Sequence, residues 1–205
     1  MIGDVHCEDQ RLAVSIATLI EAGAQTLIQV GDIVDGRGSP ERCVELLKAH
    51  DVQTIAGNHE RWFLTGEMRQ LPEATLETDE PTRAFLQALP STRRFETPRG
   101  DLLVCHGVGE SDMVNLRPDT RGYGLQSVMP ALRPLLLDDS LRFMIGGHTH
   151  QRMVRSFEGL RVINAGTLHD HGPAGFILLD VEADEVRCWD FEGDVAVQTD
   201  SLSLL

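Results

Sequence analysis

The stretch FMIGGHTHQRM, residues 143–153, joins an apolar run to two glycines and two histidines. The apolar residues 143–145 predict a buried strand, and the glycine pair 146–147 predicts its abrupt end. His148 and His150 are two residues apart, which puts side chains on one side of extended backbone but on nearly opposite sides of a helix. We therefore expect both imidazoles to leave one strand end toward one region. The pair alone is also compatible with polar residues in a surface loop, so the rest of the chain must decide.

Strand and helix patterns alternate upstream of this stretch. Residues 8–22 carry apolar side chains at a helical period, and the short β-branched run 26–30 predicts a strand that ends at a glycine. Ser39 followed by Pro40 predicts a helix N-terminus, with serine as the cap and proline in the first turn. Residues 52–56 predict the next strand. This order is typical of a parallel sheet covered by helices.

The middle of the chain is less regular. Residues 61–93 are polar and broken by three prolines, so we expect short helices in an insert that overhangs the site. Residues 109–124 are rich in glycine and predict a long loop. Residues 125–137 predict a helix, which Pro130 and Pro134 are expected to interrupt. Strands dominate the remainder, and we expect them at 102–105, 141–145, 152–157, 160–164, 175–181 and 185–191. The chain is interpreted as one domain, residues 1–205.

Polar side chains follow five of the predicted strands at their carboxyl ends. In open α/β sheets, ligands gather outside these ends, so segments far apart in the sequence can meet on one edge. The junctions are Asp4-Val5-His6, Gly31-Asp32-Ile33-Val34-Asp35, Gly57-Asn58-His59-Glu60, His106-Gly107 and Gly147-His148-Thr149-His150.

These side chains suit divalent cations. Imidazole nitrogens and carboxylate oxygens favour Mn, Zn, Fe, Co or Ni, whereas a structural zinc site would use a thiolate cluster. The candidate ligands outnumber what one tetrahedral ion needs, so we expect two ions sharing a carboxylate, about 3.5–4 Å apart. The glycines before Asp32, Asn58 and His148 are expected to permit the sharp turns that aim these side chains.

The ordered set GDVH, GDIVDG, GNHE, CHG and GGHTH resembles the calcineurin-like metallophosphoesterase superfamily. The later Asn164-Ala165-Gly166-Thr167 resembles a turn of its compact bacterial phosphodiesterases. The resemblance implies an α/β fold of two packed mixed β-sheets flanked by helices, a four-layer sandwich. It also implies the metal ligands. One ion would be held by Asp4, His6 and His150, the other by Asn58, His106 and His148, with Asp32 bridging the two.

The resemblance further implies hydrolysis of phosphoesters by hydroxide from a metal-acidified water. His59 is our candidate for the general acid at the leaving group, with a purely supporting role as the alternative. Asp35 is expected either to hydrogen-bond His59 or to cap its loop. Asn58 and Arg37 are candidate phosphate contacts, although Arg37 also fits a solvated loop arginine, because the order Asp35-Gly36-Arg37 departs from the Asp-Arg-Gly of related protein phosphatases. His169 and His171 are interpreted as loop residues near the rim.

Small phosphodiesters or nucleotide-type phosphates are the expected substrates. The alternatives are a serine/threonine-type protein phosphatase, a dinucleoside polyphosphate hydrolase, and a catalytically silent scaffold of the same fold, like the retromer scaffold subunit. Manganese heads the candidate metals, and the sequence predicts no oligomeric state.

Composition narrows the partners and the compartment. The formal net charge is -14, which repels a nucleic-acid backbone unless charge is locally inverted, so we expect nucleic acid only as short or mononucleotide substrates. Neither a signal peptide nor an apolar run long enough for a membrane span is apparent. The four scattered cysteines are typical of reduced thiols, and we expect a cytoplasmic protein.

Overall fold

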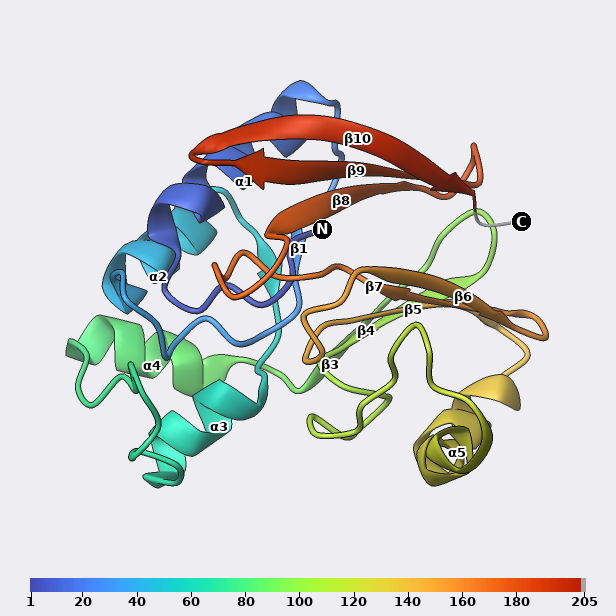
Figure 1. Ribbon diagram of the computed structural model, residues 1–205, viewed down its shortest axis with the longest axis horizontal. Coiled ribbons are helices and arrows are strands. Elements are labelled where there is room, and N and C mark those ends of the chain that lie inside the picture. The colour runs from blue at the N-terminus through green and yellow to red at the C-terminus, as the bar shows by residue number, and fades with distance from the viewer. Residues whose placement is uncertain (204–205) are drawn as a thin grey trace.

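A computed structural model, which describes residues 1–203, places two β-sheets face to face between layers of helices (Figure 1). The predicted α/β fold with two packed mixed sheets flanked by helices is confirmed. The helices are α1 (Asp9–Glu21), α2 (Pro40–Ala49), α3 (Asn58–Thr65), α4 (Glu80–Ala88) and α5 (Gly122–Leu136).

The first sheet is assembled from both ends of the chain. Parallel strands β1 (Ile28–Gln29) and β2 (Gln53–Thr54) pair with each other, and Ile2 bridges to Gln29 on the other side of β1. Ile177 donates its backbone N–H to Met1, which joins this parallel part to an antiparallel part. The antiparallel strands are β8 (Gly175–Asp180), β9 (Glu185–Glu192) and β10 (Val195–Ser203). The short segment before Asp4 therefore lies in the middle of this sheet.

The second sheet has five strands in the order β3-β4-β5-β7-β6. Its parallel centre, β4-β5-β7, is flanked by antiparallel partners at both edges. The strands are β3 (Thr92–Phe95), β4 (Asp101–Cys105), β5 (Leu141–Gly146), β6 (Met153–Phe157) and β7 (Leu160–Asn164). Glu158 and Gly159 form the predicted hairpin turn between β6 and β7, with Glu158 at a positive φ of 50°.

Three apolar clusters hold the layers together. One fills the space between the sheets, where Val104 and Ile145 of the second sheet meet Ile177 of the first. A second cluster packs α1 and α2 against the first sheet, and a third packs α5 against the outer face of the second sheet. Burial of this kind contributes roughly 1.5–3 kcal/mol per large apolar side chain, so sheet edges and strand ends are held rigidly relative to one another.

Helix α5 differs from the prediction, because it runs through Pro130 and Pro134 without interruption. Both prolines are exposed, so the carbonyl groups that lose their N–H partners face water. The opposite side of the helix buries Val128 and Leu132 against the sheet, and this packing outweighs the lost hydrogen bonds. Strands β3 and β10 were not expected from the sequence, whereas Ser39 caps α2 as predicted, its hydroxyl accepting from the Arg42 N–H at 3.1 Å.

Two further observations bear on the compositional expectations. The four cysteines are free and buried, in agreement with the predicted reduced thiols. In residues 1–203, none of the helices combines the length and apolar character needed to cross a bilayer.

We expect Pro130→Ala to stabilise the protein, because it restores a helix-interior N–H at an exposed position. Proline is about 3 kcal/mol less favourable than alanine there. Part of this is offset by roughly 0.4–1 kcal/mol of extra chain entropy in the unfolded state, which leaves a net gain of about 2–2.6 kcal/mol. Leu132→Ala, on the packed face, should instead cost about 2–5 kcal/mol. Urea unfolding of both variants measures these changes, and a loss of stability in Pro130→Ala would contradict our account of α5.

Candidate metal centre

The carboxyl ends of the strands bring all the predicted ligand residues to one edge of the two facing sheets. Asp4 and His6 follow the central segment of the first sheet, and Asp32 follows β1. Asn58 opens α3 directly after β2, His106 follows β4, and His148 and His150 follow β5. Except for the two histidines after β5, all of these residues are buried.

One half of the centre is built by His6, His150 and Asp4. The Nε2 atoms of His6 and His150 lie 3.1 Å apart, and the His150 Nε2 lies 3.3 Å from Asp4 Oδ2. The His6 Nε2 is also 3.9 Å from Asp32 Oδ2. Two imidazole nitrogens and a carboxylate oxygen thus converge from three different loops.

The other half is built by His106, His148 and Asn58. The Asn58 Oδ1 lies 3.0 Å from His106 Nε2 and 2.8 Å from His148 Nδ1. The His106 Nε2 lies 3.1 Å from Asp32 Oδ2, the same oxygen that faces His6. One Asp32 oxygen therefore borders both halves.

Backbone carbonyl groups set the tautomers of two histidines. The Nδ1–H of His6 donates to the Asp35 carbonyl at 2.9 Å, and that of His106 donates to the Val30 carbonyl at 2.7 Å. The Nε2 atom of each ring therefore faces the centre, and it offers a lone pair there whenever the ring is neutral. This arrangement is the one by which metal-binding histidines are commonly oriented.

The carboxylates and imidazole nitrogens of the centre favour a bound cation. Burial favours neutral imidazole, but the carboxylates of Asp32 and Asp4 together raise the pKa of His106 to about 10. Burial lowers the pKa of His6 to about 4 and that of His150 to about 3, so both rings are neutral ligands at neutral pH. Within residues 1–203, the buried Asp4 Oδ2 has no hydrogen-bond partner. Lone pairs and carboxylate oxygens at such distances repel one another unless positive charge lies between them, so these residues fit divalent metal ions.

The backbone around these side chains is strained. His6, Asp32, His148 and His150 all have positive φ values, between 47° and 65°, a region that residues other than glycine rarely adopt. Each such residue costs of order 1–3 kcal/mol, and strain of this kind concentrates at functional sites. His148 and His150 do point to the centre as expected, but the expected extended backbone is wrong. Both residues are left-handed, and the two rings reach separate halves of the centre.

The glycines of the motifs act more by allowing close approach than by permitting turns. A Cβ at Gly147 would lie 2.3 Å from Asp4 Oδ1, and a Cβ at Gly57 would lie 2.3 Å from Asp32 Oδ1. Of the glycines that precede Asp32, Asn58 and His148, Gly31 has the positive φ, 96°. Any larger residue at Gly57 or Gly147 would displace a carboxylate of the centre.

Glu60 supports the centre in a way that the sequence analysis did not assign. Its fully buried carboxylate accepts hydrogen bonds from the backbone N–H groups of Asp32 at 2.8 Å, Ile33 at 2.7 Å and Val34 at 3.2 Å. It also accepts from Gly57 at 2.7 Å. Glu60 thus ties the strained Asp32 loop to the start of α3. A glutamate three residues after a helix cap was the available signal, since this position commonly binds back to the cap.

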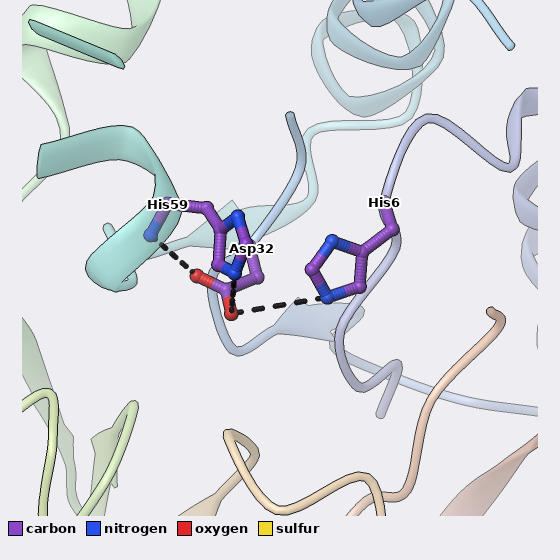
Figure 2. Close-up of side chains that lie close together, drawn as sticks. All are labelled: His6, Asp32 and His59. Atoms are coloured by element: carbon purple, nitrogen blue, oxygen red, sulfur yellow. Dashed lines mark hydrogen bonds and ion pairs between the residues drawn. The ribbon is translucent and has the colours of Figure 1, made fainter. Parts of the chain in front are cut away.

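His59 lies beside Asp32, the carboxylate that His6 also faces (Figure 2). Its backbone N–H donates to Asp32 Oδ1 at 2.9 Å, and its Nε2 lies 3.9 Å from Asp32 Oδ2. Its Nδ1 lies 2.7 Å from Asp35 Oδ2. Burial disfavours the imidazolium, but the hydrogen bond that His59 donates to Asp35 and the charge of Asp32 raise the pKa of His59 above its usual value.

The Asp35 carboxylate is itself fixed by Arg69 and Thr75. Arg69 donates to both carboxylate oxygens at 2.8 Å, and the Thr75 N–H donates to Oδ1 at 2.8 Å. Burial opposes ionisation of Asp35, yet its hydrogen bonds from His59 and Arg69 lower its pKa to about 2. Of the two roles expected for Asp35, the structure has it contact His59. Arg69 was not a sequence candidate, because nothing local marks an arginine in a polar loop.

Comparison of the sequence with models of protein families identifies the family. Residues 1–184 match the model of the calcineurin-like phosphoesterase superfamily domain. The chain belongs to this superfamily. It is therefore a calcineurin-like phosphoesterase domain.

Solved structures share its fold at low sequence identity. A hypothetical protein from Pyrococcus horikoshii OT3 superposes with a TM-score of 0.71 at 15% identity, covering 93% of this chain and 86% of that one. A metallophosphoesterase from Sphaerobacter thermophilus gives 0.62 at 20% identity, covering 93% and 87%. Vps29 from Entamoeba histolytica, in complex with Zn²⁺, gives 0.53 at 13% identity, covering 93% and 88%.

A curated protein is related in sequence over part of its length. The DNA polymerase II small subunit of Thermoplasma acidophilum is 24% identical over 182 residues. The match covers 69% of this chain and 37% of that subunit, so the phosphoesterase spans little more than a third of this relative.

The remaining candidate residues lie at the rim of the phosphoesterase centre. Arg37 is 65% exposed and pairs with Glu73 at 2.6 Å and with Asp170 at 3.4 Å. The ring of His169 lies 5.2 Å from that of His6 and stacks on His171 at 4.2 Å. His169 is buried, so the expectation of a simple rim loop understated its contact with the centre.

We expect Glu60→Gln to destabilise the phosphoesterase by roughly 2–4 kcal/mol, because an amide NH₂ would face backbone N–H donors and leave them unsatisfied. The strained Asp32 loop should loosen, and metal affinity should fall with it. The matched control is Glu67→Gln, which removes a charge at an exposed glutamate paired with Arg61. Thermal unfolding with and without added Mn²⁺ measures both effects. Equal behaviour of the two variants would refute the supporting role of Glu60.

Proposed function

We propose that the phosphoesterase holds two divalent ions. Asp4, His6 and His150 would hold one, and Asn58, His106 and His148 the other. The observation that carries this proposal is the position of Asp32 Oδ2, 3.9 Å from the His6 nitrogen and 3.1 Å from the His106 nitrogen, which suits a shared ligand. The mixed nitrogen and oxygen donors suit Mn, Fe, Zn, Co or Ni.

Ions held there would supply positive charge to the phosphoryl oxygens and lower the pKa of the attacking water. The protein's own contribution is to hold neutral imidazoles and ionised carboxylates in fixed positions. Asn58, whose amide oxygen faces His106 and His148, has its NH₂ group left to donate to a phosphoryl oxygen. The proposal therefore retains Asn58 as a candidate contact for the phosphate group of the substrate.

His59 is our candidate for protonation of the leaving oxygen. Asp35 accepts from its Nδ1–H, so the reactive proton is carried by Nε2 on the side of Asp32. The alternative is that His59 binds metal, because a ligand atom of His59 lies within 4.8 Å of those of His6 and Asp32. We favour the acid, since His150 Nε2 lies 3.1 Å from His6 Nε2 and 3.3 Å from Asp4 Oδ2, so these three residues already form a ligand set without His59.

Arg69 is proposed to position His59 through Asp35. It belongs to the predicted insert 61–93, and its contacts with Asp35 support an insert that overhangs the centre. Thr75 of the same insert accepts from the Asp35 N–H at 2.9 Å. The insert thereby restricts the Asp35 carboxylate to one orientation.

The charge balance favours phosphodiesters over monoesters at the scissile position. A monoester dianion needs more positive charge than a diester monoanion, yet the arginines on the His59 side are already neutralised by carboxylates. Arg69 pairs with Asp35, Arg61 with Asp112 and Glu67, and Arg37 with Glu73 and Asp170. Small diesters and nucleotide-type phosphates are the proposed substrates. Protein phosphatase and dinucleoside polyphosphate activities are the alternatives.

We expect purified protein loaded with Mn²⁺ to contain two ions per chain and to hydrolyse bis(p-nitrophenyl) phosphate faster than p-nitrophenyl phosphate. Asp32→Asn should lose most of the metal and the activity, because both ions share this carboxylate. Asp139→Asn, an exposed aspartate, is the charge-matched control. Elemental analysis and absorbance assays measure both quantities. Retained metal without hydrolysis of any panel substrate would favour the catalytically silent scaffold, a use of the fold by proteins such as Vps29.

We expect His59→Ala to retain its metal and to lose activity according to the leaving group. An alkoxide leaving group needs a proton, so its rate should fall by about 10²–10⁴-fold. The p-nitrophenolate group leaves without one, so its rate should change much less. Comparing a methyl p-nitrophenyl diester with a dialkyl or nucleoside diester makes this test. Loss of one ion from the variant would instead identify His59 as a ligand.

Arg69→Ala should reproduce the leaving-group dependence of His59→Ala in weaker form, because it frees Asp35 without removing the acid. We expect roughly a tenfold loss with alkyl leaving groups, by analogy with the loss of an orienting partner. Arg69→Lys should restore part of the rate. Arg83→Ala, which removes an arginine of α4 that stacks on Phe63 of α3, controls for general loss of stability. An equal effect on all leaving groups would rule out the positioning role.

A further inference from the structure

A cavity of about 360 Å³ opens directly beside the metal-site histidines. His148 and His150 form one part of its wall, and Thr167, His171 and Pro173 form another. Arg117, from the loop before α5, completes the lining. The volume exceeds what a single phosphoryl group needs and lies within the range of small-ligand pockets. The cavity is therefore suited to the part of a substrate that extends beyond the scissile phosphoester.

Arg117 differs from the arginines on the His59 side of the centre. Those arginines are paired with carboxylates, whereas within residues 1–203 no carboxylate lies at ion-pairing distance from the Arg117 guanidinium. Its backbone is held in place, because its N–H donates to Thr120 Oγ1 at 2.9 Å and its carbonyl accepts from Arg155 at 2.9 Å. A fixed loop thus places Arg117, whose guanidinium has no carboxylate partner within residues 1–203, among the residues that line the cavity.

Neighbouring arginines reinforce this positive charge. Arg155 reaches the loop through its bond to the Arg117 carbonyl, and Arg121 donates to the carbonyl groups of Pro118 and Thr120. Asp119 is the one acid in residues 117–121, so this stretch with Arg155 keeps a net positive charge. The formal net charge of the whole chain is -14, so this stretch is a local positive region beside the proposed phosphoester site. A positive region of this kind attracts anions.

We infer that Arg117 and this cavity form an anion subsite that binds a second phosphate group of the substrate. The inference rests on the proposed function, since the first phosphate must lie at the metal centre. Arginine binds phosphate through paired N–H donors, which adds specificity to charge. The substrate class is thereby narrowed to compounds with two or more phosphate groups, such as nucleotides with a further phosphate or short oligonucleotides.

The test compares ligands that differ in the second phosphate. Calorimetry on Mn²⁺-loaded full-length protein measures the affinity for thymidine 5′-monophosphate, thymidine 5′-diphosphate and thymidine 3′,5′-bisphosphate. We expect at least one of the doubly phosphorylated ligands to bind roughly tenfold to hundredfold tighter than the monophosphate. Arg117→Ala should abolish that difference, and Arg117→Lys should restore part of it.

Arg133→Ala is the matched control, because it removes the same charge from an exposed position in α5. It should leave the difference between ligands and the hydrolysis of bis(p-nitrophenyl) phosphate unchanged. The subsite is refuted if Arg117→Ala preserves the difference, or if Arg133→Ala lowers it equally. Hydrolysis by the wild type is assayed in parallel. Hydrolysis without an Arg117-dependent difference would overturn the subsite alone, and an Arg117-dependent difference without hydrolysis would overturn the proposed function alone.

Discussion

The Asp32 carboxylate is the group on which both halves of the centre depend. It is buried, it faces histidines from opposite sides, and its own backbone is left-handed with a φ of 57°. Attraction to His106, His59 and His6 outweighs the cost of burying its charge and lowers its pKa far below the usual range. A second buried carboxylate, that of Glu60, helps to hold this loop in place by accepting from its backbone N–H groups. The position of the Asp32 carboxylate is therefore fixed by the surrounding backbone and side chains.

The strained ligand residues depend on the packing of the surrounding fold. Each strained ligand residue requires compensation from packing, and the cluster between the sheets supplies it by fixing the strand ends. Gly57 and Gly147 let Asp32 and Asp4 approach the neighbouring loops more closely than a side chain would permit. The fold and the site are thus coupled, since relaxing a strand end would release both the strain and the ligand positions.

The sequence predicted what local pattern and chemical type can encode. The Asp, Asn and His residues at predicted strand ends identified the members of the centre. The order of the motifs supported a family resemblance, and that resemblance implied the four-layer fold. The sequence could not give Arg69, whose partner Asp35 is 34 residues away along the chain, or the buried contacts of His169. It also misjudged α5, because a proline rule applies to an isolated helix and not to one with a packed face. The left-handed conformations of His148 and His150 could not be predicted from the sequence either, because tertiary contacts impose them against the local backbone preference.

The two sides of the centre suggest how a substrate would be oriented. The His59 side has its arginines neutralised, so it suits a leaving group that needs a proton and not further positive charge. The side formed by His148 and His150 has the cavity with Arg117, so it suits the part of the substrate that stays on phosphorus. In-line displacement places the leaving group away from the attacking water, and binding of the retained part would fix that axis. Binding energy from a remote phosphate would then act on the rate constant as well as on affinity, because it aligns the ester with His59.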